Sequence, residues 1–338
     1  MTLDGRDITV VGGGIGGSAV ALLLARAGAA VTLLERGPAT AEVGAGLLLQ
    51  PNGLAVLADL GLADALHRAG HPMESATVRS GGRPVLTIRG SVLAVRRSVL
   101  RSVLLDAVAG EPRIDPRFDA DVTAADQTGT IEMTWDGRPG TLAADLVVGA
   151  DGVHSVVRAA GEFGAVVRPT GRRYVRGLAP RFDLAGEDWA PGGIFGGAPV
   201  DADTTYFYAS SADLVPPEIR CAISHVDDVL RVDCQRWHDG RMVLLGDAAH
   251  AMAPNLGQGA NIALVDAAVL VDALTRYRQL YPALDHYTRR RLPEVTRLQN
   301  RADLLARVAT IRNPLLRRSR DLLVRLAGRR IDREPAAV

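Results

Sequence analysis

The chain has 338 residues, of which 47% are hydrophobic and 23% charged, as in an ordinary globular protein long enough for about two domains. Its net charge of +1 gives no indication of a nucleic-acid partner, and the absence of lysine excludes lysine-dependent chemistry such as a Schiff base. Cys221 and Cys234 lack the spacing of a disulfide framework or metal site, so we expect no bound metal and a reducing, cytoplasmic location. Neither a membrane-spanning segment nor a signal peptide is expected, and the oligomeric state is left open.

The chain begins with a predicted βαβ unit. Ile8–Val11 and Val31–Leu34 are apolar runs typical of buried parallel strands, and the spacing from about Ile15 to Ala27 predicts a helix between them. Asn52–Leu60 is predicted to form a second, shorter helix.

The middle of the chain changes to a strand pattern. Ala76–Val95 alternates around a Gly81-Gly82 turn, Ser98–Ala109 returns to helical spacing, and Leu142–Gly149 is predicted as another buried strand. Arg168–Trp237 is rich in glycine, proline and aromatic residues and has strand-like stretches. We therefore expect this last segment to form a sheet of its own.

The C-terminal part is predicted to be mostly helical. A buried strand at Met242–Leu245 precedes a helix from about Gly259 to Tyr277, and Pro282–Arg330 reads as helices broken at Pro293 and Pro314. Arginines greatly outnumber acids here. Three explanations stay open: a solvated arginine face on helices packed against the N-terminal βαβ domain, attraction of an anionic small molecule, or attraction to a membrane surface.

A glycine motif lies between the first strand and the first helix. In Gly12-x-Gly14-x-x-Gly17 the glycines permit a tight turn, approach of a pyrophosphate, and close packing of the helix on the strand. The helix N-terminus offers free amides and a positive dipole end to the diphosphate. Glu35 ends the next strand, where its carboxylate suits ribose hydroxyls, and Arg36 beside it is a further candidate contact. This motif predicts FAD or NAD without deciding between them.

Two later motifs each follow a predicted strand. Asp151-Gly152 can form a turn, in which Ser155 accepts hydrogen bonds and Arg158 supplies a cation. Gly246-Asp247 opens a sixteen-residue segment in which we expect His250 to be structural rather than catalytic.

These two motifs resemble those of the class A, single-component FAD-dependent aromatic hydroxylases, which are monooxygenases of the para-hydroxybenzoate hydroxylase type. The resemblance implies an α/β fold: a Rossmann-type, glutathione reductase-like FAD domain with an inserted, mostly antiparallel substrate sheet and C-terminal helices. It implies that Asp151 lies beside FAD and the nicotinamide reductant, and that Asp247 binds the ribityl chain of FAD. The later residues expected near the flavin ring are Pro254, Gly257, Gly259 and Asn261.

Shorter stretches extend the resemblance over most of the chain. Arg97 begins a helix whose arginine contacts FAD in the family, and Gly44–Asn52 resembles the segment that passes the flavin ring. Arg176, Tyr206 and Tyr208 lie on strands of the implied substrate sheet and are candidates for the pocket. Because alternate residues of a strand point to opposite faces, each of the three has about even odds of pointing away.

The implied domains are discontinuous. Residues 1–75, 97–167 and 238–338 form the FAD domain with its C-terminal helices, and residues 76–96 and 168–237 form the substrate domain. The second domain is shorter than the family pattern between Ala209 and Trp237. We expect a thinner wall around the flavin, whose chemistry depends on exclusion of water.

The resemblance implies hydroxylation of an aromatic or polyketide-like molecule through a flavin C4a-hydroperoxide, formed with O2 after NADH or NADPH has reduced FAD. Arg158 and surface arginines are candidates for contacting the reductant, and no catalytic acid or base is assigned. The alternatives are an epoxidase, a Baeyer–Villiger enzyme, a cyclase that uses flavin as a scaffold, or a flavoprotein without turnover. A flavin halogenase is disfavoured because that chemistry relies on a lysine.

Overall fold

Six strands form a sheet with the N-terminal βαβ unit near its centre. The structure, a computed structural model, describes residues 3–40 and 44–331. The strand order is β16–β17–β10–β1–β2–β6, and every neighbouring pair is parallel except β16 with β17. The strands are β1 (Asp7–Val11), β2 (Ala30–Leu34), β6 (Ile114–Arg117), β10 (Leu146–Gly149), β16 (His238–Asp239) and β17 (Met242–Leu244).

Helices cover this parallel sheet and complete the main hydrophobic core. Helix α1 (Ile15–Arg26) packs between α4 (Arg97–Ala109) and α7 (Gly259–Arg276). Short helices α2 (Pro51–Asp59) and α3 (Ala63–Ala69) join the same core. The predicted βαβ unit and the helices after it are therefore confirmed to within one or two residues at their ends.

A small third sheet adds to the same core. It contains β7 (Ala120–Ala125), β8 (Thr130–Trp135) and β9 (Arg138–Ala143). The prediction of one strand over Leu142–Gly149 is wrong, because residue 142 pairs within β9 and the buried parallel strand β10 starts at residue 146. The break falls at Asp145, the one charged residue of the stretch, whose carboxylate accepts hydrogen bonds from the Arg6 side chain and the Asp7 amide.

The second large sheet has the order β15–β11–β14–β13–β12–β4–β5–β3. Among its described strands only β12 and β4 pair in parallel, so the expectation of a mostly antiparallel sheet is confirmed. Residues 46–49 and 71–75 also pair in this sheet, ahead of the boundary expected at residue 76. Its strands are β3 (Gly46–Leu49), β4 (His71–Ser80), β5 (Arg83–Arg96), β11 (Val166–Pro180), β12 (Gly186–Ala190), β13 (Gly193–Pro199), β14 (Thr204–Ala209) and β15 (Ile223–Asp233).

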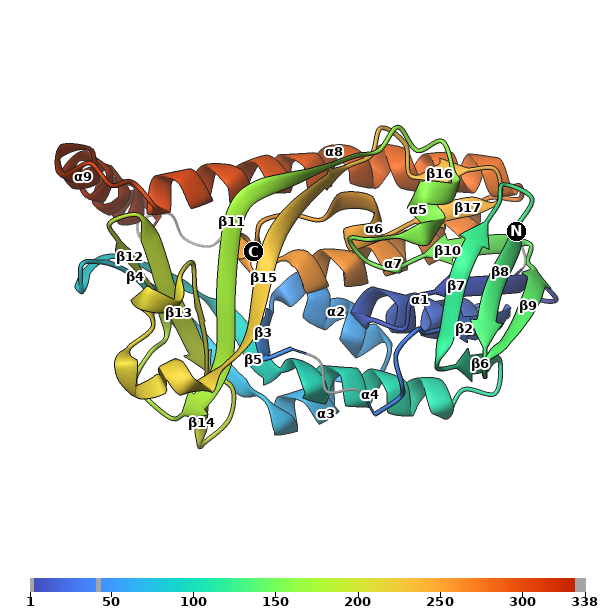
Figure 1. Cartoon of the computed structure of the whole chain (residues 1–338), viewed down its shortest axis with the longest axis horizontal. Coiled ribbons are helices and arrows are strands. Elements are labelled where there is room, and N and C mark those ends of the chain that lie inside the picture. Colours follow the sequence, from blue (N-terminus) through green and yellow to red (C-terminus); the bar gives the residue numbers. More distant parts are fainter. Residues whose placement is uncertain (1–2, 41–43, 332–338) are drawn as a thin grey trace.

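The long helix α8 (Leu280–Ala309) runs along the molecule and ends near the second sheet (Figure 1). The predicted break at Pro293 is wrong, because α8 continues through this proline. A proline costs one backbone hydrogen bond, but Tyr287, Val295 and Ala302 are buried on both sides of it and hold the helix against the core. The chain leaves the helix only before Pro314, where α9 (Pro314–Ile331) begins.

Helix α9 lies at the end of the molecule farthest from the N-terminus, beside β12 and β4 (Figure 1). It packs on β5 of the second sheet, so the expectation that all C-terminal helices pack on the nucleotide-binding domain is wrong for α9. Its exposed side also differs from the expected solvated arginine face, because it contains more leucines than arginines among the described side chains. Within the described residues, no helix is long and apolar enough to cross a membrane.

Candidate FAD and substrate site

The three sequence motifs meet at one edge of the parallel sheet. Gly12, Glu35, Asp151 and Asp247 each lie at or just beyond the carboxyl ends of β1, β2, β10 and β17, which are neighbours in the sheet. Ligands of open α/β sheets bind at this edge. Segments separated by more than 200 residues in sequence thus form one candidate site.

The glycine loop has the geometry that its spacing predicts. Gly12 has φ +103°, and a β-carbon there would overlap the carbonyl oxygen of Ala150 in the next motif. A β-carbon on Gly17 would overlap the carbonyl oxygen of Gly12, so only glycine lets α1 pack this closely on the loop. Gly14 is exposed, with nothing within 4 Å of the position a β-carbon would take. The backbone at Gly14 therefore borders open space.

Glu35 holds the loop in place. One carboxylate oxygen accepts a hydrogen bond from the Gly13 amide at 2.6 Å, and the other accepts one from the Gly37 amide at 2.8 Å. Each carboxylate oxygen has a second lone pair, so Glu35 can still accept ribose hydroxyls. The adjacent Arg36 is exposed to solvent.

Asp151 lies five residues before a short helix, α5 (Val156–Ala160), and binds its first amides. Its Oδ2 accepts hydrogen bonds from the amides of Val156 at 2.7 Å and Val157 at 3.2 Å. Its Oδ1 is buried without a hydrogen-bond partner among the described residues. Burial raises the pKa of this carboxyl group. An orphaned buried oxygen at the carboxyl edge of the sheet is a polar group placed to receive a donor from a ligand.

Arg158 joins the second motif to the third. Its guanidinium donates to the carbonyl oxygens of Ala248 at 2.8 Å and Val153 at 2.7 Å, and only 8% of the residue is exposed. The expectation that Arg158 is a free cation for the reductant is therefore wrong. Its charge is instead used to fix the two loops relative to each other.

The third motif rests on a buried ion network. Helix α6 (Asp247–His250) begins at Gly246, which has φ +61° and donates its amide to Asp266 at 3.1 Å. Asp266 is fully buried and also binds His250 at 2.5 Å and Arg291 at 2.8 Å. Burial alone would raise the pKa of Asp266, but His250 and Arg291 outweigh burial and lower it. His250 is thus a buried partner of Asp266, as expected for a structural residue.

Asn261 connects two loops and has little left for a cofactor. Its amide nitrogen donates to the carbonyl oxygens of Leu48 at 2.9 Å and Gly257 at 3.0 Å, and its amide oxygen accepts from the Gln50 amide at 2.9 Å. The side chain is fully buried. We therefore correct the expected direct flavin contact of the Asn261 side chain: it positions the loops that carry Gln50 and Gly257.

These residues fit a bound FAD. Helices α1 and α7 begin without a side-chain cap, which leaves their first amides free for a diphosphate and for the flavin carbonyl region. Asp247 and Gly257 are exposed at the same edge, and Gly257 has φ +61°. Pro254 starts the turn η3 (Pro254–Leu256) and is partly buried. Gly259, at the start of α7, has open space where a side chain would be.

All three predicted pocket residues lie on one face of the second sheet. Arg176 pairs in register with Tyr208, and Tyr206 lies two residues before Tyr208 on the same strand, so their side chains share a face. The rings of Tyr206 and Tyr208 are 5.9 Å apart, and Arg176 forms an ion pair with Asp227 at 3.2 Å. Burial raises the pKa of Tyr206, while the guanidinium groups of Arg176 and Arg97 oppose the rise.

This face looks onto the loops of the nucleotide-binding domain. Tyr206 packs against the backbone of Gly46, and the Gly44 amide donates to Nε2 of His225 at 3.1 Å. Farther along the face, the Tyr174 hydroxyl bonds Asn255 in the η3 turn. The segments expected to pass the flavin ring therefore lie against this polar, aromatic face.

A buried acid lies in the same row of the sheet. Glu187 pairs with Gly196, which pairs with Tyr208. A β-carbon on Gly196 would crowd the Tyr208 ring, so this glycine lets Tyr208 cross it and donate to Glu187 at 3.0 Å. Trp189 donates to the other oxygen of Glu187 at 2.7 Å. No basic group pairs with this acid among the described residues, and burial raises its pKa.

Comparison with known proteins identifies the family. The model of a family described as "FAD binding domain" matches residues 6–172 and 211–302, which include all three motifs. The chain belongs to the class A FAD-dependent aromatic hydroxylase-like family. It is therefore an FAD-dependent monooxygenase, an oxidoreductase.

Relatives from several bacteria support this membership. The chain is 31% identical to the aurachin C monooxygenase/isomerase of Stigmatella aurantiaca, over 84% of each chain. It is 34% identical to the 3-amino-4-hydroxybenzoate 2-monooxygenase of Streptomyces cremeus, over 89% of this chain and 87% of that one. The solved structure of the tetrameric form of 2-methyl-3-hydroxypyridine-5-carboxylic acid oxygenase matches with TM-score 0.80 and 26% identity, over 89% of this chain and 91% of that one.

Several residues of this monooxygenase site were not anticipated from the sequence. Glu187 of β12 bonds Trp189 on its own strand and Tyr208 of β14. Tyr174 meets Asn255 of the η3 turn across 81 residues. The local sequence offered one indication of a strand here: Glu187 and Trp189 are two residues apart, as side chains on one face of a strand are. It did not indicate which face is buried.

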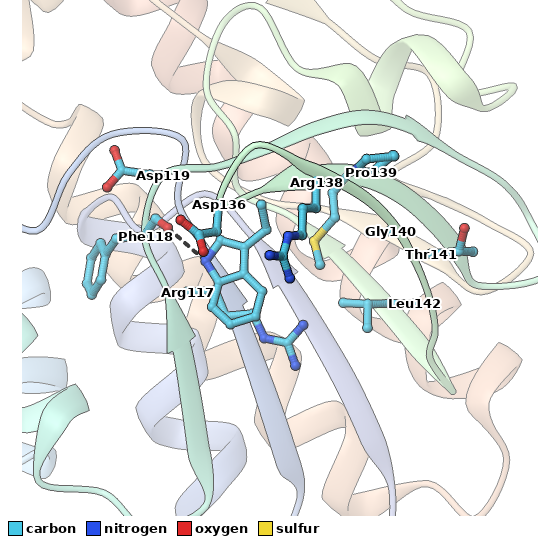
Figure 2. Close-up of a pocket in the computed structure, with 11 residues that line it drawn as sticks. Arg117, Phe118, Asp119, Asp136, Arg138, Pro139, Gly140, Thr141 and Leu142 are labelled. Atoms are coloured by element: carbon cyan, nitrogen blue, oxygen red, sulfur yellow. Dashed lines mark hydrogen bonds between the residues drawn. The ribbon is translucent and has the colours of Figure 1, made fainter.

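A hollow of about 470 Å³ lies elsewhere in this monooxygenase, on the three-stranded sheet (Figure 2). Its lining includes Arg117, whose guanidinium lies 4.7 Å from the Trp135 ring centre. None of the predicted cofactor or substrate residues lines it. We do not assign it to the flavin or the substrate. Within the described part of the chain, no group of three acidic, histidine or cysteine side chains is placed to hold a metal.

Proposed function

We propose that this monooxygenase hydroxylates an aromatic or polyketide-like small molecule, with NADH or NADPH as transient reductant and O2 as oxygen source. The observation that carries the proposal is the meeting of three FAD motifs with a polar, aromatic sheet face. When bound, FAD supplies hydride acceptance and oxygen activation. The names of relatives, such as 3-amino-4-hydroxybenzoate 2-monooxygenase, support an aromatic substrate.

The motif residues would hold and orient the cofactor. The free amides at the start of α1, beside Gly14, would bind the diphosphate, and Glu35 would bind the ribose of the adenosine. Asp247 is exposed at the sheet edge and would bind the ribityl chain. The N-terminus of α7 at Gly259 would place its positive end near the pyrimidine side of the flavin and stabilise negative charge there, by roughly 0.3–1 kcal/mol.

The second sheet would hold the substrate. The guanidinium groups of Arg176 and Arg97 lower the pKa of Tyr206, while the carboxylate of Asp227, which pairs with Arg176, raises it. The Arg97 backbone amide donates to the carbonyl oxygen of Ala45 at 3.1 Å, and the Arg97 guanidinium has no ion-pair or hydrogen-bond partner among the described residues. A phenolate or carboxylate on an aromatic ring would be recognised by these cations, with the Tyr206 hydroxyl as a neutral hydrogen-bond partner.

The two-domain division and the shortened wall between Ala209 and Trp237 belong to this proposal. A thinner wall makes exclusion of water depend more on the substrate itself. This chain matches 91% of the solved pyridine-carboxylic acid oxygenase chain, so only a small part of that fold can be missing from the wall. We also propose a cytoplasmic location, which suits the two free cysteines, Cys221 and Cys234.

The test measures oxidation of NADH and NADPH with and without a panel of phenols, hydroxybenzoates and hydroxypyridine carboxylates. Under ¹⁸O2 we expect substrate-stimulated oxidation and one ¹⁸O atom in a new ring hydroxyl. An epoxide, or an oxygen inserted beside a ketone, would replace hydroxylation by one of the alternative reactions. No stimulation across the panel, with FAD bound, would leave a flavoprotein without turnover.

A matched pair of variants checks the substrate face. Arg176→Gln should raise KM for an anionic substrate about tenfold or more, since a charged hydrogen bond contributes about 1.5–3 kcal/mol. Arg173→Gln is the control, because Arg173 is exposed three residues away and pairs with the exposed Asp228. Equal effects of the two substitutions would contradict a pocket on the Arg176 face.

A further inference from the structure

Helix α9 presents a stripe of exposed leucines. Their exposed fractions are unusually large: Leu315 69%, Leu316 59%, Leu322 58%, Leu323 66% and Leu326 49%. These positions recur at helical spacing, so the five side chains lie on the solvent side of the helix, with the exposed Ser319 between Leu316 and Leu322. We refer to these five leucines as the leucine stripe. An exposed apolar patch of this kind marks an interaction surface.

The helix holds the stripe firmly, so the exposure is not fraying of a loose terminus. Asn313 caps the first turn by accepting hydrogen bonds from the amides of Leu315 at 2.9 Å and Leu316 at 3.2 Å. Arg320, only 5% exposed, donates to the carbonyl oxygen of Ala309 at 3.0 Å and to the Ser80 hydroxyl at 2.8 Å.

The packing also explains why leucines face solvent. The Arg320 guanidinium lies 5.0 Å from the Trp189 ring centre and occupies the inner side of α9. Gly328 continues the same side, where a β-carbon would crowd the Leu86 side chain. A polar anchor thus faces the protein, and the apolar side of this amphipathic helix faces outward, the reverse of an ordinary surface helix.

The charges around the stripe are positive. Arg318 and Arg325 are exposed and lie seven residues apart, which places them along one edge of the stripe. Among the described side chains of α9, Asp321 is the sole acid, and Arg320 neutralises it at 2.7 Å. A second copy packed antiparallel about a two-fold axis would bring these arginines against their own equivalents, without a carboxylate of α9 to compensate.

We propose that the leucine stripe of α9 docks on an anionic lipid surface, with Leu322 and Leu323 entering the headgroup boundary and Arg318 and Arg325 meeting lipid phosphates. Leucines on one side and arginines at the edge are the composition of interfacial helices. The docking does not depend on which substrate the monooxygenase oxidises. It would bring the end of the molecule that carries the second sheet to the membrane surface.

The test is co-sedimentation of the FAD-loaded full chain with vesicles. We expect binding to phosphatidylcholine vesicles that contain phosphatidylglycerol, weaker binding as NaCl rises, and little binding to phosphatidylcholine alone. The double variant Leu322→Gln/Leu323→Gln should lower the partition coefficient about tenfold or more. The double variant Arg318→Gln/Arg325→Gln should lower it about fivefold for each arginine.

Controls separate docking from unfolding and from self-association. Val166→Gln and Arg138→Gln change an exposed apolar residue and an exposed arginine elsewhere, and should leave vesicle binding unchanged. Circular dichroism and FAD content should match the wild type in every variant. Absence of binding at all lipid compositions would overturn the proposal. So would a stable dimer in light scattering that the two leucine substitutions convert to monomer.

Discussion

Residues of the substrate face are fixed by hydrogen bonds to other elements of the sheet. Glu187 has the most restrictive surroundings among them, because it is a buried acid. The residue is 9% exposed, and its carboxyl group receives hydrogen bonds only from Trp189 and Tyr208 among the described residues. A buried acid with neutral donors costs free energy once it is ionised. Its raised pKa means that the folded state binds its proton more tightly than the unfolded chain does.

The pH dependence of stability follows from that difference. Below the ordinary pKa of 4.5 both states are protonated, and stability falls as the pH rises from there through the folded pKa. Glu187→Gln should remove this fall, so its Tm relative to the wild type should increase with pH. At low pH, where the Glu187 carboxyl group is protonated, Glu187→Ala should cost about 1–3 kcal/mol, because two buried donors lose their acceptor. This cost should shrink as the pH rises through the folded pKa.

The measurement is thermal unfolding by circular dichroism across this pH range. Exposed Glu132 on β8 supplies the control, and Glu132→Gln should leave the curve unchanged. A constant Tm difference between Glu187→Gln and the wild type at every pH would show that the Glu187 carboxyl group ionises alike in both states.

Asn261 gives a second prediction at the residue scale. Asn261→Ala should lower stability by about 1–3 kcal/mol for each buried backbone group left unpaired. It should also weaken FAD binding, because the loops at Gln50 and Gly257 lose their common support. Flavin fluorescence titration and urea unfolding measure the two effects. Asn300→Ala, at an exposed position on α8, is the control. A destabilised variant with unchanged FAD affinity would show that these loops do not contact the cofactor.

At the scale of elements, β13 contributes a position without a side chain, Gly196. Gly196 leaves the space through which Tyr208 of β14 reaches Glu187 of β12. Gly196→Val should displace the Tyr208 ring and cost about 1–3 kcal/mol from overpacking. Gly140→Val, on the exposed strand β9 where space is open, is the control. Equal stability of the two variants in urea unfolding would mean that Tyr208 can reach Glu187 by another path.

Helices α8 and α9 show how an element's surroundings override its sequence. The proline in α8 did not end the helix, because buried side chains on both sides keep it on the core. The apolar side of α9 predicts burial, yet the helix is oriented by Arg320 and leaves that side in solvent. Local spacing predicted both helices, and their packing decided the break in one and the orientation of the other.

For the whole molecule, the Asp266 network ties the third FAD motif to helices α6, α7 and α8. Its members are fully or nearly fully buried, and it fixes the Gly246 amide at the end of β17. Removing one charge leaves Arg291 buried without its main counter-ion. Asp266→Asn should therefore destabilise the protein by about 3–5 kcal/mol.

Urea unfolding of Asp266→Asn, followed by tryptophan fluorescence, provides the measurement. Asp272→Asn is the matched control, since Asp272 lies on the same helix in an exposed pair with Arg276. A surface pair contributes at most about 1 kcal/mol. If both variants lose equally little stability, the network does not join the three helices energetically.

Local sequence patterns were enough to predict the cofactor class, the βαβ unit and the order of the motifs. These depend on short-range chemistry: a glycine where φ is positive, an apolar run that must be buried, and a carboxylate at a strand end. The same local patterns predicted a second sheet rich in aromatic residues. They left open which residues share one face of that sheet.

The hydrogen-bond partners of the site residues could be known only from the folded chain. Arg158 finds its acceptor 90 residues away, and Asn261 finds one 213 residues away, so neither contact leaves a local pattern. The common face of Arg176, Tyr206 and Tyr208 follows from strand register, which long-range hydrogen bonds set. Whether the leucines of α9 are buried was decided by the anchoring of Arg320, because an amphipathic pattern defines two sides of a helix and not which side meets the protein.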